Sequence, residues 1–250
     1  MSLNLFKIKQ KLIAEGQRFA VATIAAESSS LINGAFPVPQ IGSKIILTAD
    51  GQVFGTTGND TLDEEVMRKL RECLHNREDN SISITQSLKI FIERVEPAPA
   101  LVIIGASETG LAIAKLAANL DFRIIIVDER ADLANKQRFP MADSIVCESD
   151  LLKALSLISF DESCYVVIVF QANDDRAVRY CLNKPWAYCG MLGSKNRIGA
   201  VWEKLRRDGA PEARLKAVHA PIGFDIGAQS PEEIAIATLA EVLAVKNKKS

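Results

Sequence analysis

The residues best placed to do chemistry lie in a short turn, Gly105-Ala-Ser-Glu-Thr-Gly110, between an apolar run and a stretch of helical periodicity. A dinucleotide-binding fingerprint reads G-x-G-x-x-G at such a junction, because its glycines let the backbone approach a pyrophosphate closely. Gly105 and Gly110 match the first and third glycines, whereas Ser107 replaces the second. Since a helix N-terminus carries unpaired N–H groups and a partial positive charge, the turn is predicted to bind an anion.

Ser107 leaves the nature of the ligand open. Its Cβ adds bulk where a pyrophosphate approaches, but its hydroxyl can donate to a phosphate oxygen. Asp128 ends the next apolar run, about twenty residues further on, where the fingerprint expects an acid that binds the ribose hydroxyls of NAD. The neighbouring Arg130 would instead favour a 2′-phosphate, as in NADP. The alternative is a Rossmann scaffold that binds no nucleotide.

A second anion site is predicted at Gly193-Ser-Lys-Asn-Arg197, where a short apolar run gives way to a helix. Gly193 and Ser194 are small residues at a helix start, and Lys195 and Arg197 place cations beside them. The surrounding stretch 184–216 holds eight basic residues and three acidic ones in a chain whose net charge is −1. The alternative is a solvated basic face with a capping serine.

A third polar string, His219-Ala-Pro-Ile-Gly-Phe-Asp-Ile-Gly-Ala228, contains one proline and two glycines, and is predicted to be neither helix nor strand. Its two ionisable groups are His219 and Asp225, and Gly223 bends the backbone between them. Irregular segments that follow parallel strands often carry binding residues. A single histidine is equally compatible with a purely structural role.

Other reactive side chains give weaker signals. The five cysteines contain no C-x-x-C pair and their spacing suits no zinc site, so reduced and mostly buried thiols are expected. Tyr180 and Lys184, one helical turn apart, are the pair that short-chain dehydrogenases use, which keeps an NAD(P)-dependent oxidoreductase as an alternative function. Those enzymes have a different glycine spacing, however, and Pro185 would end the helix at once, so packing and surface roles are favoured for the pair.

The secondary structure predicted around these residues indicates an α/β protein. Its C-terminal part, residues 97–250, is expected to form a domain with a Rossmann-like parallel sheet. Continuous apolar runs, typical of strands covered on both faces, alternate there with helical segments. The strands are expected at Leu101–Ile104, Arg123–Val127 and Tyr165–Phe170, and the helices at Thr109–Leu120, Asp150–Ile158, Asp174–Leu182 and Arg197–Arg207. A last helix should begin with Ser230 as N-cap, Pro231 at its first position and Glu233 closing a capping box.

Residues 1–96 predict a smaller α+β domain, joined to the second by the proline-containing segment 95–100. Its expected elements are a helix around Leu5–Ile13, strands at Phe19–Ala25, Lys44–Thr48 and Gln52–Phe54, a helix at Leu62–Leu74 and a strand with two-residue periodicity from Ile82 to Ile92. Asp50-Gly51 is a strong hairpin signal between the second and third of these strands.

Composition excludes several classes of protein. The 250 residues are 48% hydrophobic and 24% charged, which is typical of a globular protein large enough to bury a core without disulfides. A net charge of −1 argues against nucleic acid as a partner. The apolar runs are far shorter than a membrane span needs, and the N-terminus does not resemble a signal peptide, so a cytoplasmic protein without membrane partners is expected.

The chain resembles the xanthine dehydrogenase accessory factor family (XdhC/CoxI-like). The strings that carry the resemblance are LVIIGASETG, IIIVDER, RFPMAD, GMLGSKNR and HAPIGFDIGAQSPEEIAIATLAEVLA, and more loosely FAVATIAAESSS and TADGQVFG. The resemblance implies an N-terminal family domain, a C-terminal Rossmann domain and a role in maturing molybdenum hydroxylases such as xanthine dehydrogenase. It also implies the molybdenum pterin cofactor as ligand, and we expect a homo-oligomer; NAD(P) is the alternative ligand.

The chain departs from that family at three places. Thr61 stands where typical members have a cysteine, and a hydroxyl is a poor substitute for a soft thiolate ligand. Ser107 and Glu108 replace the glycine and histidine of the family's usual turn, and the stretch 171–175 has lost a histidine. These changes keep the predicted anion-binding frame but remove soft and imidazole ligands. A divergent nucleotide-binding paralogue without cofactor handling is therefore a further alternative.

Overall fold

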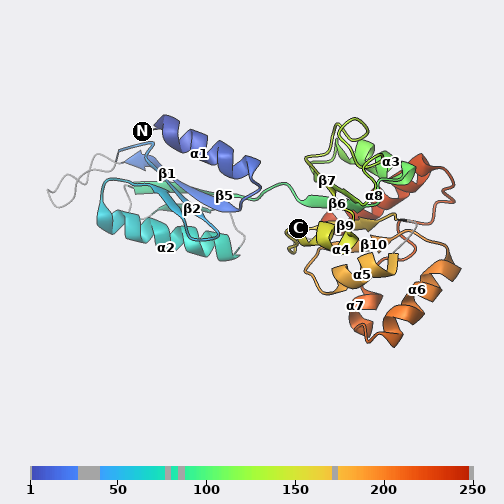
Figure 1. Ribbon diagram of the computed structural model, residues 1–250. Coiled ribbons are helices and arrows are strands. Elements are labelled where there is room, and N and C mark those ends of the chain that lie inside the picture. Colours follow the sequence, from blue (N-terminus) through green and yellow to red (C-terminus); the bar gives the residue numbers. More distant parts are fainter. Residues whose placement is uncertain (1, 28–39, 77–79, 84–87, 171–173, 248–250) are drawn as a thin grey trace. The chain divides into compact units, whose positions relative to one another are not determined.

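The computed structural model of the chain describes residues 2–27, 40–76, 80–83, 88–170 and 174–247. The chain divides into two compact units, Met1–Pro97 and Ala98–Ser250. Figure 1 shows a sheet with flanking helices in each of them.

The first unit is an antiparallel sheet with one helix on each face (Figure 1). In chain order its elements are α1 (Ser2–Ala14), β1 (Phe19–Glu27), β2 (Lys44–Thr48), β3 (Val53–Gly55), α2 (Asp60–Asn76), β4 (Asn80–Ser83) and β5 (Leu88–Val95), and the strand order is β3-β2-β1-β5-β4. Alternate residues of β1 face opposite sides: Ala20 and Ala22 pack with α2, whereas Phe19 and Val21 pack with α1. The predicted hairpin at Asp50-Gly51 joins β2 to β3.

One prediction for this unit is wrong. A single strand was expected from Ile82 to Ile92, but the chain forms two antiparallel strands, β4 and β5, in which Ser83 pairs with Lys89. The residues between them, 84–87, lie outside the described part of the chain. The two-residue alternation of apolar side chains is the same in one long strand and in two successive antiparallel strands. Periodicity by itself therefore did not show that the chain changes direction between β4 and β5.

The second unit is a five-stranded parallel sheet in the order β10-β9-β6-β7-β8. Its elements are β6 (Ala100–Ile104), α3 (Glu108–Ala117), β7 (Arg123–Asp128), β8 (Ser144–Cys147), α4 (Leu151–Ser156), β9 (Tyr165–Ile168), α5 (Asp174–Leu182), β10 (Tyr188–Met191), α6 (Lys195–Arg207), α7 (Glu212–Lys216) and α8 (Pro231–Asn247). This confirms the Rossmann-like fold. The short elements β8 and α7 were not predicted, because four or five partly exposed residues leave little periodic signal.

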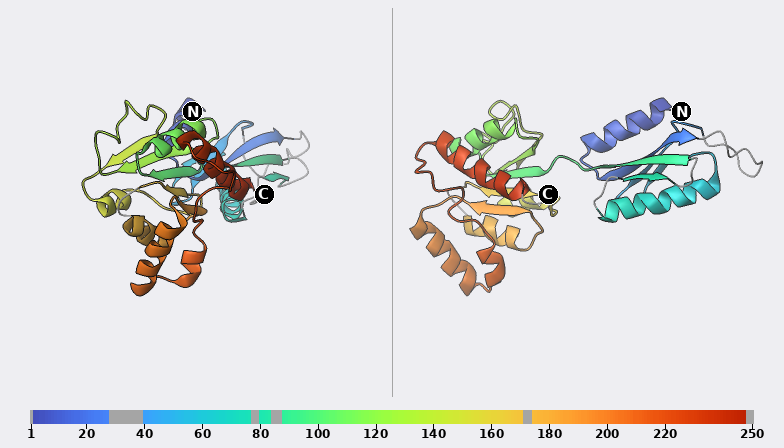
Figure 2. Two further views of the ribbon diagram at one scale, coloured as in Figure 1. Left: turned by 90° about the vertical axis from the view of Figure 1, so that its right-hand side faces the viewer. Right: turned by 180° about the vertical axis from the view of Figure 1, so that it is seen from behind.

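Helices cover both faces of this sheet (Figures 1 and 2). The core on one face contains residues of α3 and α8, and the core on the other contains residues of α4, α5, α6 and α7. The central strand β6 is buried along its whole length, as its continuous apolar run predicts. Because β7 and β8 extend to one side of β6 and β9 and β10 to the other, the strand order reverses at β6. In open α/β sheets, ligands bind at this point, outside the carboxyl ends of the strands.

Candidate anion-binding site

The turn after β6 lies at this switch point, and its two glycines are required by close packing. Gly105 has a φ of +119°, and a Cβ there would lie 2.8 Å from the backbone nitrogen of Phe170, just beyond β9. A Cβ at Gly110 would lie 2.2 Å from the carbonyl oxygen of Gly105. The first glycine therefore permits the turn, and the last lets α3 pack directly against it.

Ser107 acts as the N-cap of α3, because its Oγ accepts a hydrogen bond from the Gly110 N–H at 3.2 Å. Its hydroxyl is thus used within the turn. The N–H of Ala106 donates to Asp128. Among the residues that the structure describes, the N–H groups of Ser107, Glu108 and Thr109 have no hydrogen-bond partner. Three consecutive free amides at a helix N-terminus can donate hydrogen bonds to the oxygens of one bound oxyanion, such as a phosphate group.

Asp128 is fully buried at the end of β7, and its carboxylate is saturated by protein donors. It accepts hydrogen bonds from the Ala106 N–H at 2.6 Å, the Arg130 N–H at 2.9 Å, and Nε and Nη2 of Arg130 at 2.9 and 2.8 Å. Burial by itself would raise the pKa of Asp128, but these hydrogen bonds outweigh it and hold the pKa below its ordinary value. The carboxylate therefore stays ionised and fastens the glycine turn to β7.

Arg130 covers Asp128 with a half-exposed guanidinium, which also lies 5.5 Å from the ring centroid of Phe170. A ribose diol could reach Asp128 only if Arg130 moved away. The exposed guanidinium is, by contrast, suited to a phosphate. The geometry thus favours a phosphate contact at Arg130 over a diol contact at Asp128.

An acidic residue lies at the start of α3, next to the free amides of the turn. No role in binding was predicted for it from the sequence. Glu108 is the first residue of α3, its side chain is exposed, and it forms an ion pair with Arg138 at 2.6 Å. A negative charge at a helix N-terminus stabilises the helix but competes with a bound anion. The position was visible in the sequence, whereas its pairing with Arg138, thirty residues away, was not.

The second predicted turn lies at the carboxyl end of β10, along the same edge of the sheet. Ser194 is the N-cap of α6, and its Oγ accepts from the Arg197 N–H at 3.3 Å. Lys195 is exposed and has no ion pair with any described residue. Arg197, in contrast, pairs with the buried carboxylate of Asp174 at the start of α5, with 2.7 Å between Nη2 and Oδ2. Lys195 is therefore the cation that this turn offers to a ligand, beside the small residue Gly193.

The third predicted string is held by a glutamate that sequence reasoning missed. Glu241, on α8, accepts a hydrogen bond from the Gly223 N–H at 2.9 Å and lies 2.9 Å from Nδ1 of His219. Asp225 is exposed and accepts only a long hydrogen bond, 3.4 Å, from Gly227 among the described contacts. The structure thus joins His219 to Gly223 but not to Asp225. The single charged residue in the stretch 234–245 was the available signal for Glu241.

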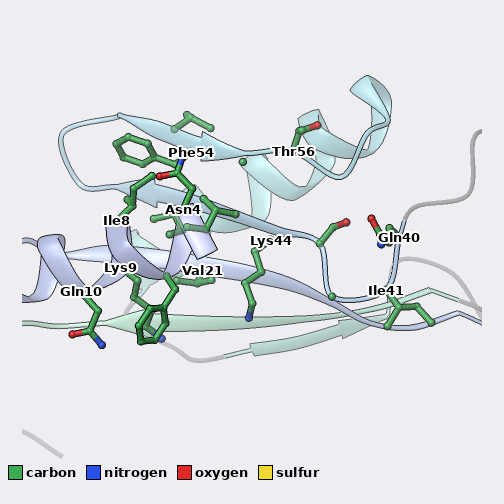
Figure 3. A pocket seen from close by; sticks show the side chains of 17 residues that line it. Asn4, Ile8, Lys9, Gln10, Val21, Gln40, Ile41, Lys44, Phe54 and Thr56 are labelled. Carbon is green, nitrogen blue, oxygen red and sulfur yellow. The ribbon is translucent and has the colours of Figure 1, made fainter. Parts of the chain in front are cut away.

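The first unit contains a cavity of about 1140 Å³ between α1 and strands β2 and β3 (Figure 3). Ile8, Val21 and Phe54 give it an apolar lining. Its two lysines are already engaged, because Lys9 pairs with Glu93 and Lys44 donates to the Thr23 hydroxyl. The cavity therefore lacks the uncommitted charge that the turns of the second unit provide.

The remaining candidates do not form a reactive centre. Lys184 lies over the Tyr180 ring, which packs against Phe160, in agreement with the packing role favoured for this pair. In the part of the chain that the structure describes, no three His, Cys, Asp or Glu side chains form a group that could hold a metal ion. None of the described helices is long and apolar enough to cross a membrane. The predicted departure at 171–175 lies partly outside the described residues.

The parallel sheet with helices on both faces, and the glycine turn between β6 and α3, define a Rossmann-type domain. A family model described as the XdhC Rossmann domain matches residues 101–242, and one described as the XdhC and CoxI family matches residues 12–84. The chain belongs to the XdhC family.

Individual relatives agree with this assignment. The uncharacterized protein YqeB of Escherichia coli K12 is 29% identical over 98% of this chain and 47% of its own length. A protein of Bacillus subtilis 168, described as a probable subunit of xanthine dehydrogenase, is 28% identical over 65% of the chain and 48% of its own length. The chain thus spans about half the length of these curated relatives. A crystal structure of a xanthine dehydrogenase from Bacillus halodurans shares the fold, with a TM-score of 0.56, 18% identity, and coverage of 98% of this chain and 96% of that one.

Proposed function

We propose that this chain is an accessory factor in the maturation of a molybdenum hydroxylase of the xanthine dehydrogenase type. Membership of the XdhC family carries the proposal, and the name of the Bacillus subtilis relative supports it. The protein would bind a phosphate-bearing pterin cofactor or a dinucleotide in its second unit and contact the enzyme that receives the cofactor.

The residues present fit the phosphate part of such a ligand better than its metal part. The free amides at the start of α3, with Arg130 beside them, provide donors for a phosphate group. The molybdenum of a pterin cofactor prefers soft ligands, and Thr61 offers a hydroxyl. We therefore propose that this chain binds the phosphate group of the cofactor, and we propose no residue of the chain as a ligand of the molybdenum. The cofactor's redox chemistry would be used by the partner enzyme.

The oxidoreductase alternative is less well supported. NAD recognition through Asp128 would require Arg130 to give up its contacts with that carboxylate and with the Phe170 ring. The ring of Tyr180 packs against Phe160, and the Lys184 ammonium lies over it, so this pair is engaged in packing contacts within the protein. We expect no turnover of NADH or NADPH by the purified chain.

Glu108→Gln is expected to strengthen the binding of inorganic pyrophosphate about two- to five-fold, because it removes a negative charge from the helix start and releases Arg138. Isothermal titration calorimetry of the full chain measures the effect. Glu232→Gln is the matched control, since it removes the same charge from the first turn of α8. Equal affinities for all three proteins would contradict binding at α3.

The partner proposal predicts that the tagged full chain, expressed in its native source, recovers a molybdenum hydroxylase. Mass spectrometry of the eluate identifies the recovered protein, and the tag alone serves as control. Recovery of no molybdenum enzyme under gentle conditions would argue against the accessory role while leaving pyrophosphate binding unaffected.

A further inference from the structure

The backbone of His219 is fixed as a one-residue extension of the parallel sheet. It forms a parallel bridge with Gly190 of β10, its N–H donates to the Cys189 carbonyl, and its own carbonyl accepts from the Met191 N–H, each at 2.9 Å. The imidazole is thus presented from a rigid strand position rather than from a free loop.

The imidazole ring is held by a carboxylate that other donors already position. Glu241 Oε2 accepts hydrogen bonds from the Tyr188 hydroxyl at 2.5 Å and the Gly223 N–H at 2.9 Å, while Oε1 lies 2.9 Å from His219 Nδ1. Burial alone would raise the pKa of Glu241, but these partners outweigh it and lower the pKa. Glu241 is therefore ionised and can only accept hydrogen bonds.

An accepting carboxylate determines which ring nitrogen carries the hydrogen. The 2.9 Å contact requires N–H at Nδ1, so the neutral ring has its lone pair on Nε2. Tyr188 covers one side of the ring, with 4.6 Å between ring centroids, and 37% of the His219 side chain remains exposed. The hydrogen bond of the ring to a described residue is made through Nδ1, and Nε2 has no such partner among the described residues. A carboxylate behind Nδ1 and an open Nε2 are the features of an imidazole base.

We propose that His219 is a proton-accepting binding site for a ligand with a weakly acidic N–H or O–H group. The ligand's N–H or O–H bond breaks, its electron pair stays on the ligand, and the proton forms an Nε2–H bond. Glu241 stabilises the resulting imidazolium. The site uses residues of β10, α8 and the string after α7, and it is independent of the phosphate contact at α3.

The first test is the reactivity of the ring towards diethyl pyrocarbonate, which acylates an unprotonated imidazole nitrogen. The chain has two histidines, so His75 is an internal reference. Peptide mass spectrometry at pH 9, where an imidazole of ordinary pKa is unprotonated, should show that Glu241→Gln slows modification of His219 about two- to three-fold and leaves His75 unchanged, because the neutral ring loses the carboxylate that makes Nε2 more basic. Glu232→Gln, on the same helix, is the matched control. An unreactive His219, or a rate that Glu241→Gln leaves unchanged, would overturn the proposal.

The second test needs no variant, in case Glu241→Gln fails to fold. Long-range nitrogen–proton NMR spectra of the full chain should show the neutral His219 ring with its hydrogen on Nδ1, and the opposite tautomer would overturn the proposal. Uracil, a planar molecule with acidic N–H groups, should protect His219 from modification at millimolar concentration. 1,3-Dimethyluracil, which lacks those groups, should not. If uracil and 1,3-dimethyluracil protected His219 equally, or if neither did, the proposed ligand class would be wrong.

Discussion

Arg197→Met is expected to lower the free energy of unfolding by about 3 kcal/mol at neutral pH, since it leaves a buried charge without its partner. Asp174 is 3% exposed, and neither of its oxygens accepts a well-aligned hydrogen bond from a described residue. The Arg197 guanidinium, 2.7 Å away, is the counter-charge on this carboxylate. Chemical denaturation of the wild type and the variant, followed by circular dichroism, measures the difference.

The reciprocal change should be far milder. Asp174→Asn removes the buried charge itself, and the Arg197 side chain, 38% exposed, can be solvated once it is released. We expect a loss of less than about 1 kcal/mol, and the double variant should resemble Asp174→Asn. Equal losses for the two single variants would contradict this account of the pair.

The effect of Arg197→Met should also depend on pH. Burial raises the pKa of Asp174 above its ordinary value of 3.8, although Arg197 opposes the shift. The folded protein therefore binds a proton more tightly than the unfolded chain, and stability falls as pH rises from 3.8 through the raised value. Removing Arg197 raises this pKa further. The difference between variant and wild type should be largest at neutral pH and shrink towards pH 4, and a difference independent of pH would contradict the mechanism.

Gly110→Ala is expected to destabilise the second unit by about 3 kcal/mol and to abolish pyrophosphate binding. The added Cβ would lie 2.2 Å from the Gly105 carbonyl oxygen, a backbone atom that cannot move aside without shifting the turn or α3. Either shift displaces the amides of Ser107, Glu108 and Thr109. Thermal unfolding and calorimetry with pyrophosphate measure the two effects.

Gly199→Ala is the matched control for this substitution. Gly199 lies in α6, and a Cβ there would meet no atom within 4 Å. Alanine in a helix interior should increase stability by about 0.5–1 kcal/mol. If Gly110→Ala behaved like this control, the close packing of α3 on the turn would not be needed for the fold.

The sequence by itself determined the secondary structure that carries the site. Continuous apolar runs predicted the buried strands β6, β7 and β9, and Ser230 and Glu233 form the predicted capping box at the start of α8. Gly105 and Gly110 were recognised from spacing alone. These features are local, so a few neighbouring residues are enough to specify them.

Only the tertiary structure decided which polar groups remain available to a ligand. Asp128 matched the ribose-binding position, yet Ala106 and Arg130 occupy its carboxylate; Arg197 matched an anion contact, yet it neutralises Asp174. Glu241 gained its importance from its contact with His219, 22 residues away. A charged side chain is available to a ligand only if the fold brings it no partner from another element. Pairing between side chains so far apart in the chain produces no periodic pattern, so a single sequence does not reveal it.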